Sequence, residues 1–500
     1  MHYSSVKSAV LSGLRVVKIN VEADINTKSV AQDWEIVGLG DTSVKESRKR
    51  VMSAIKNSGF GIPHGRITIN LAPGDVKKEG ALLDLPIAIA ILMAAGKINS
   101  DGKWFLIGEL GLDGSVRKIN GALPIMLEKD DSATAVVPMD NQMELSLVNM
   151  PNTYAVDSLV DAVKLIEGEK FPPIEKAILR ERRTYDVDFS EVHGQEVAKR
   201  ALEIAAAGFH NVLMKGPPGS GKTMLARRLP TIMPPMSEKE IIESTKIYSA
   251  AGMLDGSPIT QRPFRSPHHS ASTASIVGGG AKAKPGEVTL AHNGVLFMDE
   301  MPEFKRDVLE ALRQPLEDGV VTVSRVKESH TYPARFLLIG AQNPCMCGWY
   351  GVEDGVHHCT CSISEIIRYN KKISGPIADR MDIFVNVPHV DYDQYASMKD
   401  AEPSKKILER VMNAVEIQFK RSGKQNGKLT AKEVKRFCAL GDAEEAFFKA
   451  AAKKLGLSGR TMEKTLKVAR TIADLAGEEK ISTAHLAEAL QYRKKEEIFV

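Results

Sequence analysis

A glycine-rich segment carries the clearest chemical signal in the chain. It reads GPPGSGKT, lies between the apolar run NVLMK and the helix-like run MLARRL, and spans residues 216–223. Glycines let successive backbone N–H groups face phosphate oxygens, and the start of the following helix adds partial positive charge. In this pattern the lysine reaches the β- and γ-phosphates and the threonine binds Mg²⁺. We expect a nucleoside triphosphate, ATP, to be bound by Gly216, Pro217, Pro218, Gly219, Ser220, Gly221, Lys222 and Thr223.

A second apolar run, residues 294–298, ends in two adjacent carboxylates, Asp299 and Glu300. A carboxylate here can hold the Mg²⁺ shell, and its neighbour can orient and polarise the attacking water. An Asp-Glu pair at the end of a strand is also common on solvent-facing ends. Because the pair follows the phosphate-binding loop in the expected order, we predict that Asp299 binds Mg²⁺ and that Glu300 is catalytic.

Four of the five cysteines fall close together, as Cys345, Cys347, Cys359 and Cys361. Four thiolates satisfy tetrahedral Zn²⁺ and leave no open position, so the cluster predicts a structural zinc site. The C-x-C spacing is less common than C-x-x-C, and His357 and His358 are close enough to replace a cysteine ligand. The fifth cysteine, Cys438, is expected to be an inert core residue.

Composition indicates a cytoplasmic protein of several domains. The 500 residues, 43% hydrophobic and 26% charged, suit about three soluble domains, and five cysteines are too few for a disulfide scaffold. The N-terminus lacks a signal pattern, and the longest apolar run, residues 85–95, is too short to span a bilayer. Residues 401–500 hold 21 Lys and Arg against 14 Asp and Glu. This basic region permits contact with nucleic acid, and it equally fits a solvated helical surface.

The pattern of apolar residues divides the chain into three parts. Residues 1–174 form an α+β domain, with strands expected at 16–23, 34–37 and 66–71 and a helix at 43–58. The charged stretch 175–188 is a predicted linker into an ATPase domain at 175–394, which contains the cysteine-rich insertion. Residues 395–500 are helical and form a C-terminal lid.

The N-terminal part carries several runs that resemble a known family: DWEIVGLGD at 33–41, VKESRKRV at 44–51, ITINLAPGD at 67–75 and DLPIAI at 84–89. With the motifs above they are similar to the YifB/ComM family of magnesium-chelatase-like AAA+ ATPases over essentially the whole chain. The resemblance implies a first domain like the protease domain of Lon, which uses a Ser–Lys dyad. Here EGALLDLP at 79–86 has no serine where the nucleophile should lie, and GSVRKING at 114–121 lacks a lysine after its glycine. Acyl-enzyme chemistry needs both, so we expect an assembly or substrate-binding module.

The same resemblance assigns roles to three further residues. A buried strand ends at Asn343, which resembles the sensor 1 amide that can bond the γ-phosphate and the lytic water. The segment GPIADRMDI, residues 375–383, resembles the one that carries an arginine finger, so Arg380 is the candidate supplied to a neighbouring subunit. Arg460, in LSGRT, resembles sensor 2. Either arginine could instead be a structural salt-bridge residue.

Two excursions interrupt the ATPase pattern, at 248–287 and at 319–335. The first is too rich in Gly, Pro and Ser for a core, and the second has the pattern of a β-hairpin. They resemble the helix-2 insert and the pre-sensor hairpin that project into the pore of related AAA+ rings. Two adjacent histidines point differently and more often solvate a loop than bind metal. The residues expected to touch DNA are Arg265, His268, His269, Arg325 and Lys327.

We therefore expect an α/β P-loop AAA+ motor with a C-terminal helical lid, preceded by an α+β Lon-protease-like domain. The resemblance implies a hexameric ring that uses ATP, Mg²⁺ and Zn²⁺, acts on branched or single-stranded DNA, and drives branch migration during natural transformation. No membrane and no small-molecule substrate other than ATP is expected. A chelatase-type remodeller acting on a protein or in metal insertion is the alternative. It is disfavoured because no porphyrin-binding partner domain is present and a Lon-like domain is not expected in chelatase motor subunits. An ATP-dependent protease is disfavoured by the missing dyad.

Overall fold

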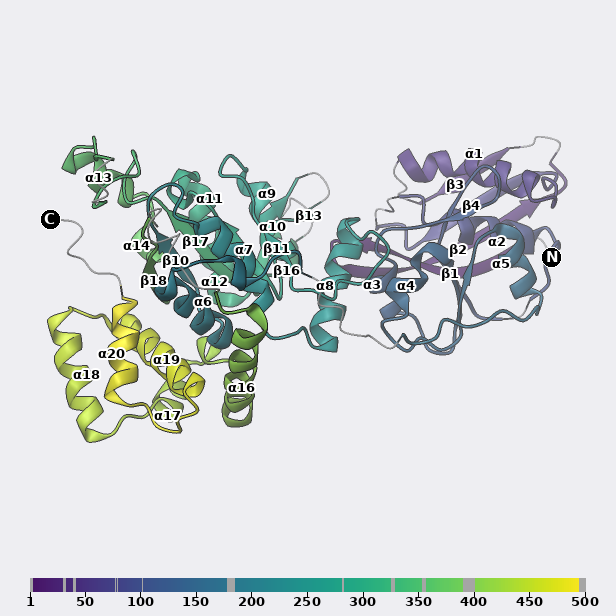
Figure 1. Cartoon of the computed structure of the whole chain (residues 1–500). Coiled ribbons are helices and arrows are strands. Elements are labelled where there is room, and N and C mark those ends of the chain that lie inside the picture. The colour runs from purple at the N-terminus through teal and green to yellow at the C-terminus, as the bar shows by residue number, and fades with distance from the viewer. Residues whose placement is uncertain are drawn as a thin grey trace. The chain divides into compact units, whose positions relative to one another are not determined.

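The computed structural model describes residues 3–29, 33–38, 42–76, 78, 80–100, 102–177, 185–280, 283–324, 329–352, 357–389 and 401–493. The chain forms two compact units (Figure 1). The first comprises Met1–Glu181 with Glu238–Thr260, and the second comprises Arg182–Ser237 with Gln261–Val500. Among the described residues, no helix combines the length and the apolar character needed to cross a membrane.

The first unit is built on a seven-stranded mixed sheet with strand order β3-β4-β2-β1-β5-β8-β9. Buried and exposed side chains alternate along β2 and β4, because one face of each strand packs on the core. The predicted strands are confirmed, and β1, which pairs with β2 along its whole length, is additional. The strands are β1 (Tyr3–Ser12), β2 (Arg15–Asn26), β3 (Trp34–Val37), β4 (Arg66–Ala72), β5 (Trp104–Leu106), β8 (Thr134–Pro138) and β9 (Thr153–Val156), with a separate hairpin of β6 (Glu109–Leu110) and β7 (Val116–Arg117).

Among the helices of the first unit, the buried helix α2 packs directly on β1 and β2 of this sheet. Its residues are apolar all round, as the run 85–95 predicts, and its first residue, Asp84, is buried against Arg50 with an Nε to Oδ2 distance of 2.7 Å. The predicted helix 43–58 is confirmed as α1. The helices are α1 (Thr42–Asn57), α2 (Asp84–Ala94), α3 (Ala122–Leu127), α4 (Gln142–Leu145), α5 (Leu159–Ile166) and α8 (Glu238–Ala251), with a 3₁₀ turn η1 (Met139–Asn141).

Helix α8 comes from the middle of the range 175–394 that the sequence assigns to the ATPase domain, yet it belongs to the first unit. The Ser249 carbonyl accepts from the Gly121 N–H at the start of α3, and the Leu254 carbonyl accepts a side-chain hydrogen bond from Lys118 Nζ. The chain therefore leaves the second unit after α7 and returns before β11. A local apolar pattern cannot reveal this exchange, because packing partners that are distant in sequence decide it.

The second unit has a five-stranded parallel sheet, order β11-β14-β17-β10-β18. Its central strands are almost entirely buried, because helices cover both faces. Parallel strands bring their carboxyl ends to one edge, which is where ligands bind in such sheets. The strands are β10 (Val212–Lys215), β11 (Phe264–Arg265), β14 (Val295–Met298), β17 (Leu337–Gln342) and β18 (Ile383–Asn386), with hairpins β12 (Gly278–Gly279) to β13 (Lys284–Pro285) and β15 (Val320–Ser324) to β16 (Ser329–Pro333).

Five C-terminal α-helices confirm the predicted helical region, and no strand occurs in the described range 401–493 (Figure 1). They share one apolar core with α6, α7 and the parallel sheet. Ser458 caps α19 by accepting from the Thr461 N–H. The helices of this unit are η2 (Phe189–Glu191), α6 (Glu196–Gly208), α7 (Lys222–Ile232), α9 (Thr273–Val277), α10 (Glu287–Leu290), η3 (Met301–Glu303), α11 (Arg306–Ala311), α12 (Arg313–Asp318), α13 (Ile363–Asn370), α14 (Gly375–Ala378), α16 (Ser404–Ser422), η4 (Asn426–Lys428), α17 (Ala431–Phe437), α18 (Asp442–Lys454), α19 (Gly459–Leu475) and α20 (Thr483–Gln491).

Candidate nucleotide hydrolysis site

The phosphate-binding loop joins the carboxyl end of β10 to the start of α7, in the strand, loop and helix order that its sequence predicts. Gly219 and Gly221 have φ angles of 76° and 86°, in the left-handed region that favours glycine. At Gly216 a Cβ atom would lie 2.1 Å from the Val387 carbonyl oxygen, so only glycine fits. Each of the three positions therefore favours glycine for its own local reason. Together the glycines give a loop that can enclose phosphate.

Lys222 points into the centre of this loop. Its Nζ donates to the carbonyl oxygens of Gly216 and Pro217, both at 2.8 Å, and lies 3.3 Å from Asn343 Oδ1. Burial lowers the pKa of Lys222, while the carboxylates of Asp299 and Glu300 act in the opposite direction. An ammonium held by neutral oxygens in this position is suited to binding the β- and γ-phosphates.

Thr223 and Asp299 meet across the gap between α7 and the end of β14. The Thr223 Oγ1 donates to Asp299 Oδ2 at 2.6 Å, so a hydroxyl and a carboxylate converge on one point. Hard oxygen ligands from one or two side chains, completed by phosphate and water, are what Mg²⁺ takes in nucleotide sites. The residues present therefore fit a magnesium ion.

Glu300 follows Asp299 in a left-handed backbone conformation, with φ of 48°, and its side chain is 53% exposed. Its Oε2 lies 3.3 Å from Nδ1 of His269. The neighbouring His268 instead bonds Ser270 Oγ at 2.8 Å. The sequence predicts both histidines as DNA contacts. The contact of His269 with the candidate catalytic base could not be predicted, because 30 residues lie between the two in the chain.

Asn343 follows β17, which lies between β14 and β10 in the sheet. Its Oδ1 faces Lys222 Nζ, and the Gln342 carbonyl accepts from the Gly216 N–H at 3.1 Å. An amide at this position can hydrogen-bond the γ-phosphate and thereby couple hydrolysis to the position of β17. The structure thus brings Lys222, Thr223, Asp299, Glu300 and Asn343 to one edge of the parallel sheet.

Arg380 lies at the opposite edge. Its backbone carbonyl accepts from Asn211 Nδ2 at the amino end of β10, whereas the phosphate-binding loop follows the carboxyl end. Four strand residues span about 13 Å. The side chain is 8% exposed, and its Nη2 lies 2.5 Å from Glu317 Oε1. Arg380 therefore cannot reach the loop of its own chain without a large rearrangement.

Arg460 lies near the same carboxylate. The hydrogen bond from Arg380 holds the pKa of Glu317 below its usual range, and the charge of Arg460 adds to this effect. Farther along α19, Lys464 Nζ lies 2.9 Å from Asp382 Oδ1, beside the start of β18. Arg460 itself is exposed. Arg380 and the helix that carries Arg460 therefore lie near the start of β18.

The first excursion is less separate from the core than its polar composition suggests. Phe264 and Arg265 form β11, which pairs with β14, and the Arg265 guanidinium makes two bonds to Glu287 of 2.6 and 2.8 Å. The predicted hairpin is present as β15 and β16. Arg325 and Lys327, both predicted to touch DNA, lie outside the described residues.

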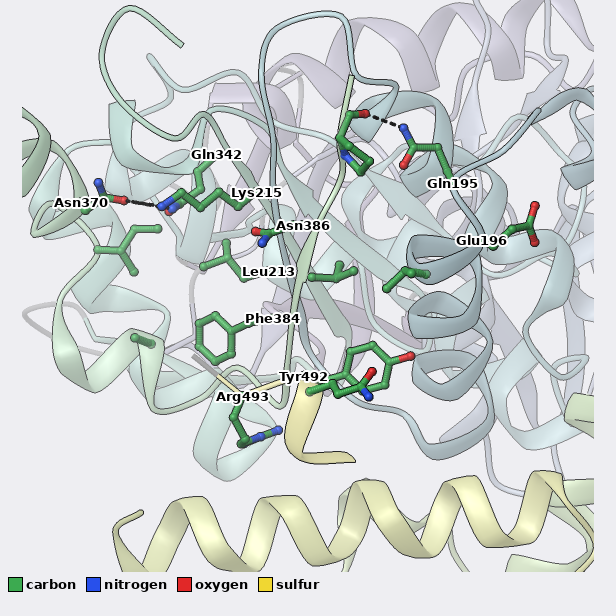
Figure 2. Close-up of a pocket in the computed structure, with 16 residues that line it drawn as sticks. Gln195, Glu196, Leu213, Lys215, Gln342, Asn370, Phe384, Asn386, Tyr492 and Arg493 are labelled. Carbon is green, nitrogen blue, oxygen red and sulfur yellow. Dashed lines mark hydrogen bonds between the residues drawn. The ribbon is translucent and has the colours of Figure 1, made fainter. Parts of the chain in front are cut away.

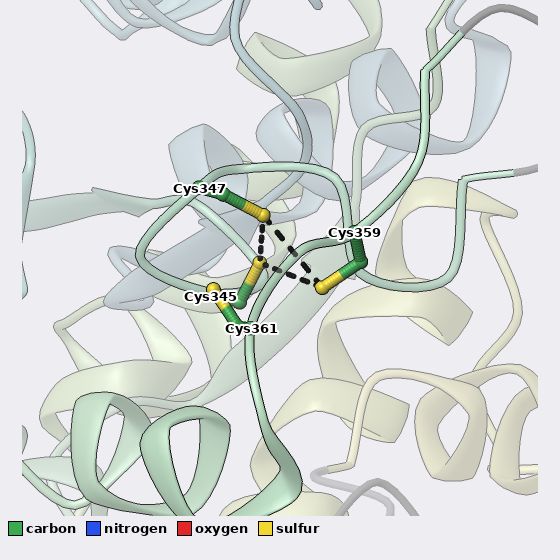
Figure 3. A group of neighbouring side chains, drawn as sticks. All are labelled: Cys345, Cys347, Cys359 and Cys361. Atoms are coloured by element: carbon green, nitrogen blue, oxygen red, sulfur yellow. Dashed lines mark hydrogen bonds between the residues drawn. The ribbon is translucent and has the colours of Figure 1, made fainter.

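The four cysteines of the predicted zinc site converge in one loop after β17 (Figure 3). Sγ distances are 3.3 Å for Cys345 to Cys347, 3.7 Å for Cys345 to Cys359 and 3.6 Å for Cys347 to Cys359. Four thiolates at about 2.3 Å from a tetrahedral Zn²⁺ lie about 3.8 Å apart. His357 instead stacks on Trp349, with ring centroids 3.7 Å apart. The four thiols fit Zn²⁺ without a histidine ligand.

A pocket of about 690 Å³ lies along the edge strand β18, and none of the predicted site residues lines it (Figure 2). Its lining includes Gln195, Lys215, Phe384 and Tyr492. The Gln195 amide donates to the Pro388 carbonyl at 2.7 Å and to the Ser220 carbonyl at 3.3 Å. Gln195 therefore braces the phosphate-binding loop from the side of this pocket. This role of Gln195 could not be predicted from sequence, since a lone glutamine carries no motif.

Three family models match consecutive parts of the chain. They are described as magnesium chelatase, subunit ChlI (residues 188–395), subunit ChlI of Mg-chelatase (residues 21–141), and magnesium chelatase, subunit ChlI C-terminal (residues 401–493). The match at residues 21–141 shows that the N-terminal region also resembles a magnesium-chelatase subunit. That region is therefore no longer an argument against a chelatase-type activity.

Curated relatives match over nearly the full length. Competence protein ComM of Haemophilus influenzae is 42% identical over 99% of this chain and 98% of that protein. Uncharacterized protein YifB of Escherichia coli is 41% identical over 100% of this chain and 99% of that protein. The magnesium-chelatase 67 kDa subunit of Heliobacterium mobile is 26% identical over 44% of this chain and 38% of that protein.

Proposed function

The chain belongs to the YifB/ComM family of magnesium-chelatase-related proteins, and we propose that it is an ATP-driven AAA+ motor that assembles as a ring, moves on DNA and promotes branch migration. The proposed pathway is recombination of incoming DNA during natural transformation. The observation that carries the ATPase part is the convergence of Lys222, Thr223 and Asp299 at one sheet edge, with Asn343 beside them.

In the proposed reaction, Lys222 leaves its two loop carbonyls and binds the β- and γ-phosphates. Thr223 and Asp299 would hold Mg²⁺, which when bound neutralises charge on the phosphate oxygens. Glu300 orients and polarises the attacking water, and Asn343 bonds the γ-phosphate. Each residue needs only a side-chain movement, since all of them already lie at this edge.

Assembly into a ring, with six subunits as in the family, is supported by the position of the arginines. Arg380 and Arg460 lie near Glu317, at the edge opposite their own phosphate-binding loop. A neighbouring subunit that places this edge against the loop would receive both cations. An arginine supplied in this way stabilises charge on the transferred phosphoryl group by roughly 10³–10⁵ in rate. The active site would then lie between subunits and be incomplete in a monomer.

A role on DNA is supported by the name of the Haemophilus influenzae relative, since competence is the state in which a cell takes up DNA. The contact of His269 with Glu300 would allow DNA binding to affect ATP hydrolysis, because His269 belongs to the excursion proposed to bind DNA. Contacts of this kind would be to the backbone, with little base preference. Binding should therefore weaken steeply between about 50 and 200 mM salt.

The test combines ATPase and junction-dissolution measurements on the full chain. ATP hydrolysis is measured without DNA and with single-stranded, duplex or four-way-junction DNA, and dissolution of a labelled junction is followed with ATP. Wild type should dissolve the junction and Lys222→Ala should not. An Arg325→Ala, Lys327→Ala double variant should hydrolyse ATP without DNA stimulation. If wild type hydrolyses ATP at a rate that no DNA changes and leaves junctions intact, the chelatase-type remodeller, acting on a protein or in metal insertion, replaces this proposal.

A further inference from the structure

The phosphate-binding loop is braced by the same short segment that carries the first two cysteines, residues 342–348. At its start, the Gln342 carbonyl accepts from the Gly216 N–H at 3.1 Å. Next along the segment, Asn343 Oδ1 lies 3.3 Å from Lys222 Nζ. Cys345 and Cys347 follow, and the segment ends at Gly348.

Gly348 packs directly on the phosphate-binding loop. A Cβ atom there would lie 2.6 Å from Cδ of Pro218, and the residue has a φ of 90°. The Cys345 carbonyl accepts from the Gly348 N–H at 3.1 Å, which fixes the turn between the two cysteines. The thiol cluster is thus joined to Pro218 through a single tight turn.

The second cysteine pair closes the loop onto the same strand. Ser362, directly after Cys361, caps α13, and Asn370 at the end of that helix donates to the Pro344 carbonyl at 3.2 Å. Asn370 Oδ1 also accepts from Gln342 Nε2 at 3.3 Å and lies 3.5 Å from Lys215 Nζ. Both ends of the cysteine loop therefore reach the residues next to the phosphate-binding loop.

We propose that Zn²⁺ bound by the four cysteines sets the affinity of the chain for ATP, by fixing the segment 342–348 against the phosphate-binding loop. The inference rests on the proposed ATPase and on zinc as the bound metal. The four thiols tie Cys345 and Cys347 to Cys359 and Cys361 across the loop, next to the stacked rings of Trp349 and His357. When zinc leaves, the turn at Gly348 is released, and Pro218 and Asn343 lose the support that holds them in position for phosphate.

The test measures zinc content and the affinity for a fluorescent ATP analogue on the full chain. Zinc is removed with a chelator, the chelator is separated from the protein, and binding is measured in Mg²⁺ buffer before and after zinc is restored. We expect the dissociation constant to rise about tenfold without zinc, equivalent to about 1.4 kcal/mol, and to return when zinc is restored. Equal affinity in the loaded and stripped protein would overturn the inference.

A pair of glycine variants separates the effect of the Gly348–Pro218 contact on nucleotide binding from the effect of losing zinc. Gly348→Ala places a methyl group against Pro218, whereas Gly351→Ala, at a similar φ of 73°, meets nothing within 4 Å. Both should keep zinc, and only Gly348→Ala should weaken nucleotide binding. Equal affinities in the two variants would overturn the role of the Gly348 contact. Purified protein that binds ATP but carries no zinc would overturn the inference and leave the ATPase proposal intact, whereas a zinc-loaded protein that binds no ATP would overturn both.

Discussion

His269 Nδ1 lies 3.3 Å from Glu300 Oε2, so a loop proposed to meet DNA contacts the carboxylate proposed to activate water. A carboxylate engaged by a histidine is less free to turn toward a water at the γ-phosphate. The arrangement gives DNA a direct means to change the hydrolysis rate, because any contact that moves His269 also changes the surroundings of Glu300.

Replacement of His269 tests this relationship. His269→Ala should raise the ATPase rate without DNA and reduce the stimulation by DNA, since Glu300 is released in both conditions. His268→Ala is the matched control, because His268 bonds Ser270 rather than Glu300. Steady-state ATPase assays with and without DNA provide the readout. A His269→Ala rate below that of wild type in both conditions would show that the histidine supports Glu300 instead of restraining it.

Glu300→Gln should hydrolyse ATP at least roughly 10²-fold more slowly and still bind it, because a lost general base affects the water and not the phosphates. The bound nucleotide should be recovered as ATP after rapid gel filtration. Lys222→Ala is the contrasting variant and should lose nucleotide binding itself. Wild-type hydrolysis by Glu300→Gln would remove Glu300 from the role of base.

Arg380→Ala should lose roughly 10³-fold in ATPase rate and regain part of it when mixed with Glu300→Gln subunits. In such a ring, an intact Glu300 on one subunit can meet an intact Arg380 on the next. A Glu300→Gln, Arg380→Ala double variant as the mixing partner supplies no arginine and should give no rescue. Failure of the first mixture at every ratio would argue against a role across subunits.

Protein purified without added zinc should contain one Zn²⁺ per chain, with an apparent binding energy of ~10–16 kcal/mol as in comparable structural sites. Cys361→Ser should lose the metal. Cys438→Ala should retain it, because Cys438 is buried in the lid core and apart from the cluster. Elemental analysis of the native protein measures the zinc content, and thiol titration measures how many cysteines are free. Well under one equivalent of zinc, with four freely titratable thiols, would rule the site out.

The first unit should have no protease activity, since segment 79–86 has no serine at the expected nucleophile position and segment 114–121 has no lysine after its glycine. Casein and peptide substrates should survive incubation with ATP. The informative control is a variant of any polar residue in this unit, such as Ser115→Ala. Cleavage by wild type that such a variant abolishes would restore a catalytic role to this domain.

Residue type and spacing were enough to predict which residues lie together at the phosphate-binding loop. The motifs at 216–223 and 299–300 are recognisable because each directly follows an apolar strand. Parallel strands bring their carboxyl ends to one edge of a sheet, so the sequence already implies that the two motifs meet there. The cysteine cluster was predictable for a similar reason, since four thiolates within 17 residues can reach one ion. The helical C-terminus followed from cap residues such as Ser458 and Ser482 and from a sequence with hardly any strand signal.

Tertiary structure decided the features that depend on contacts between segments distant in the chain. Helix α8 belongs to the first unit because its partners are in α3, and no local pattern records that choice. The pairing of Arg380 with Glu317, the approach of His269 to Glu300 and the packing of Gly348 on Pro218 arise in the same way. Sequence specifies which groups are available for chemistry, whereas side-chain packing at short range determines which of them meet.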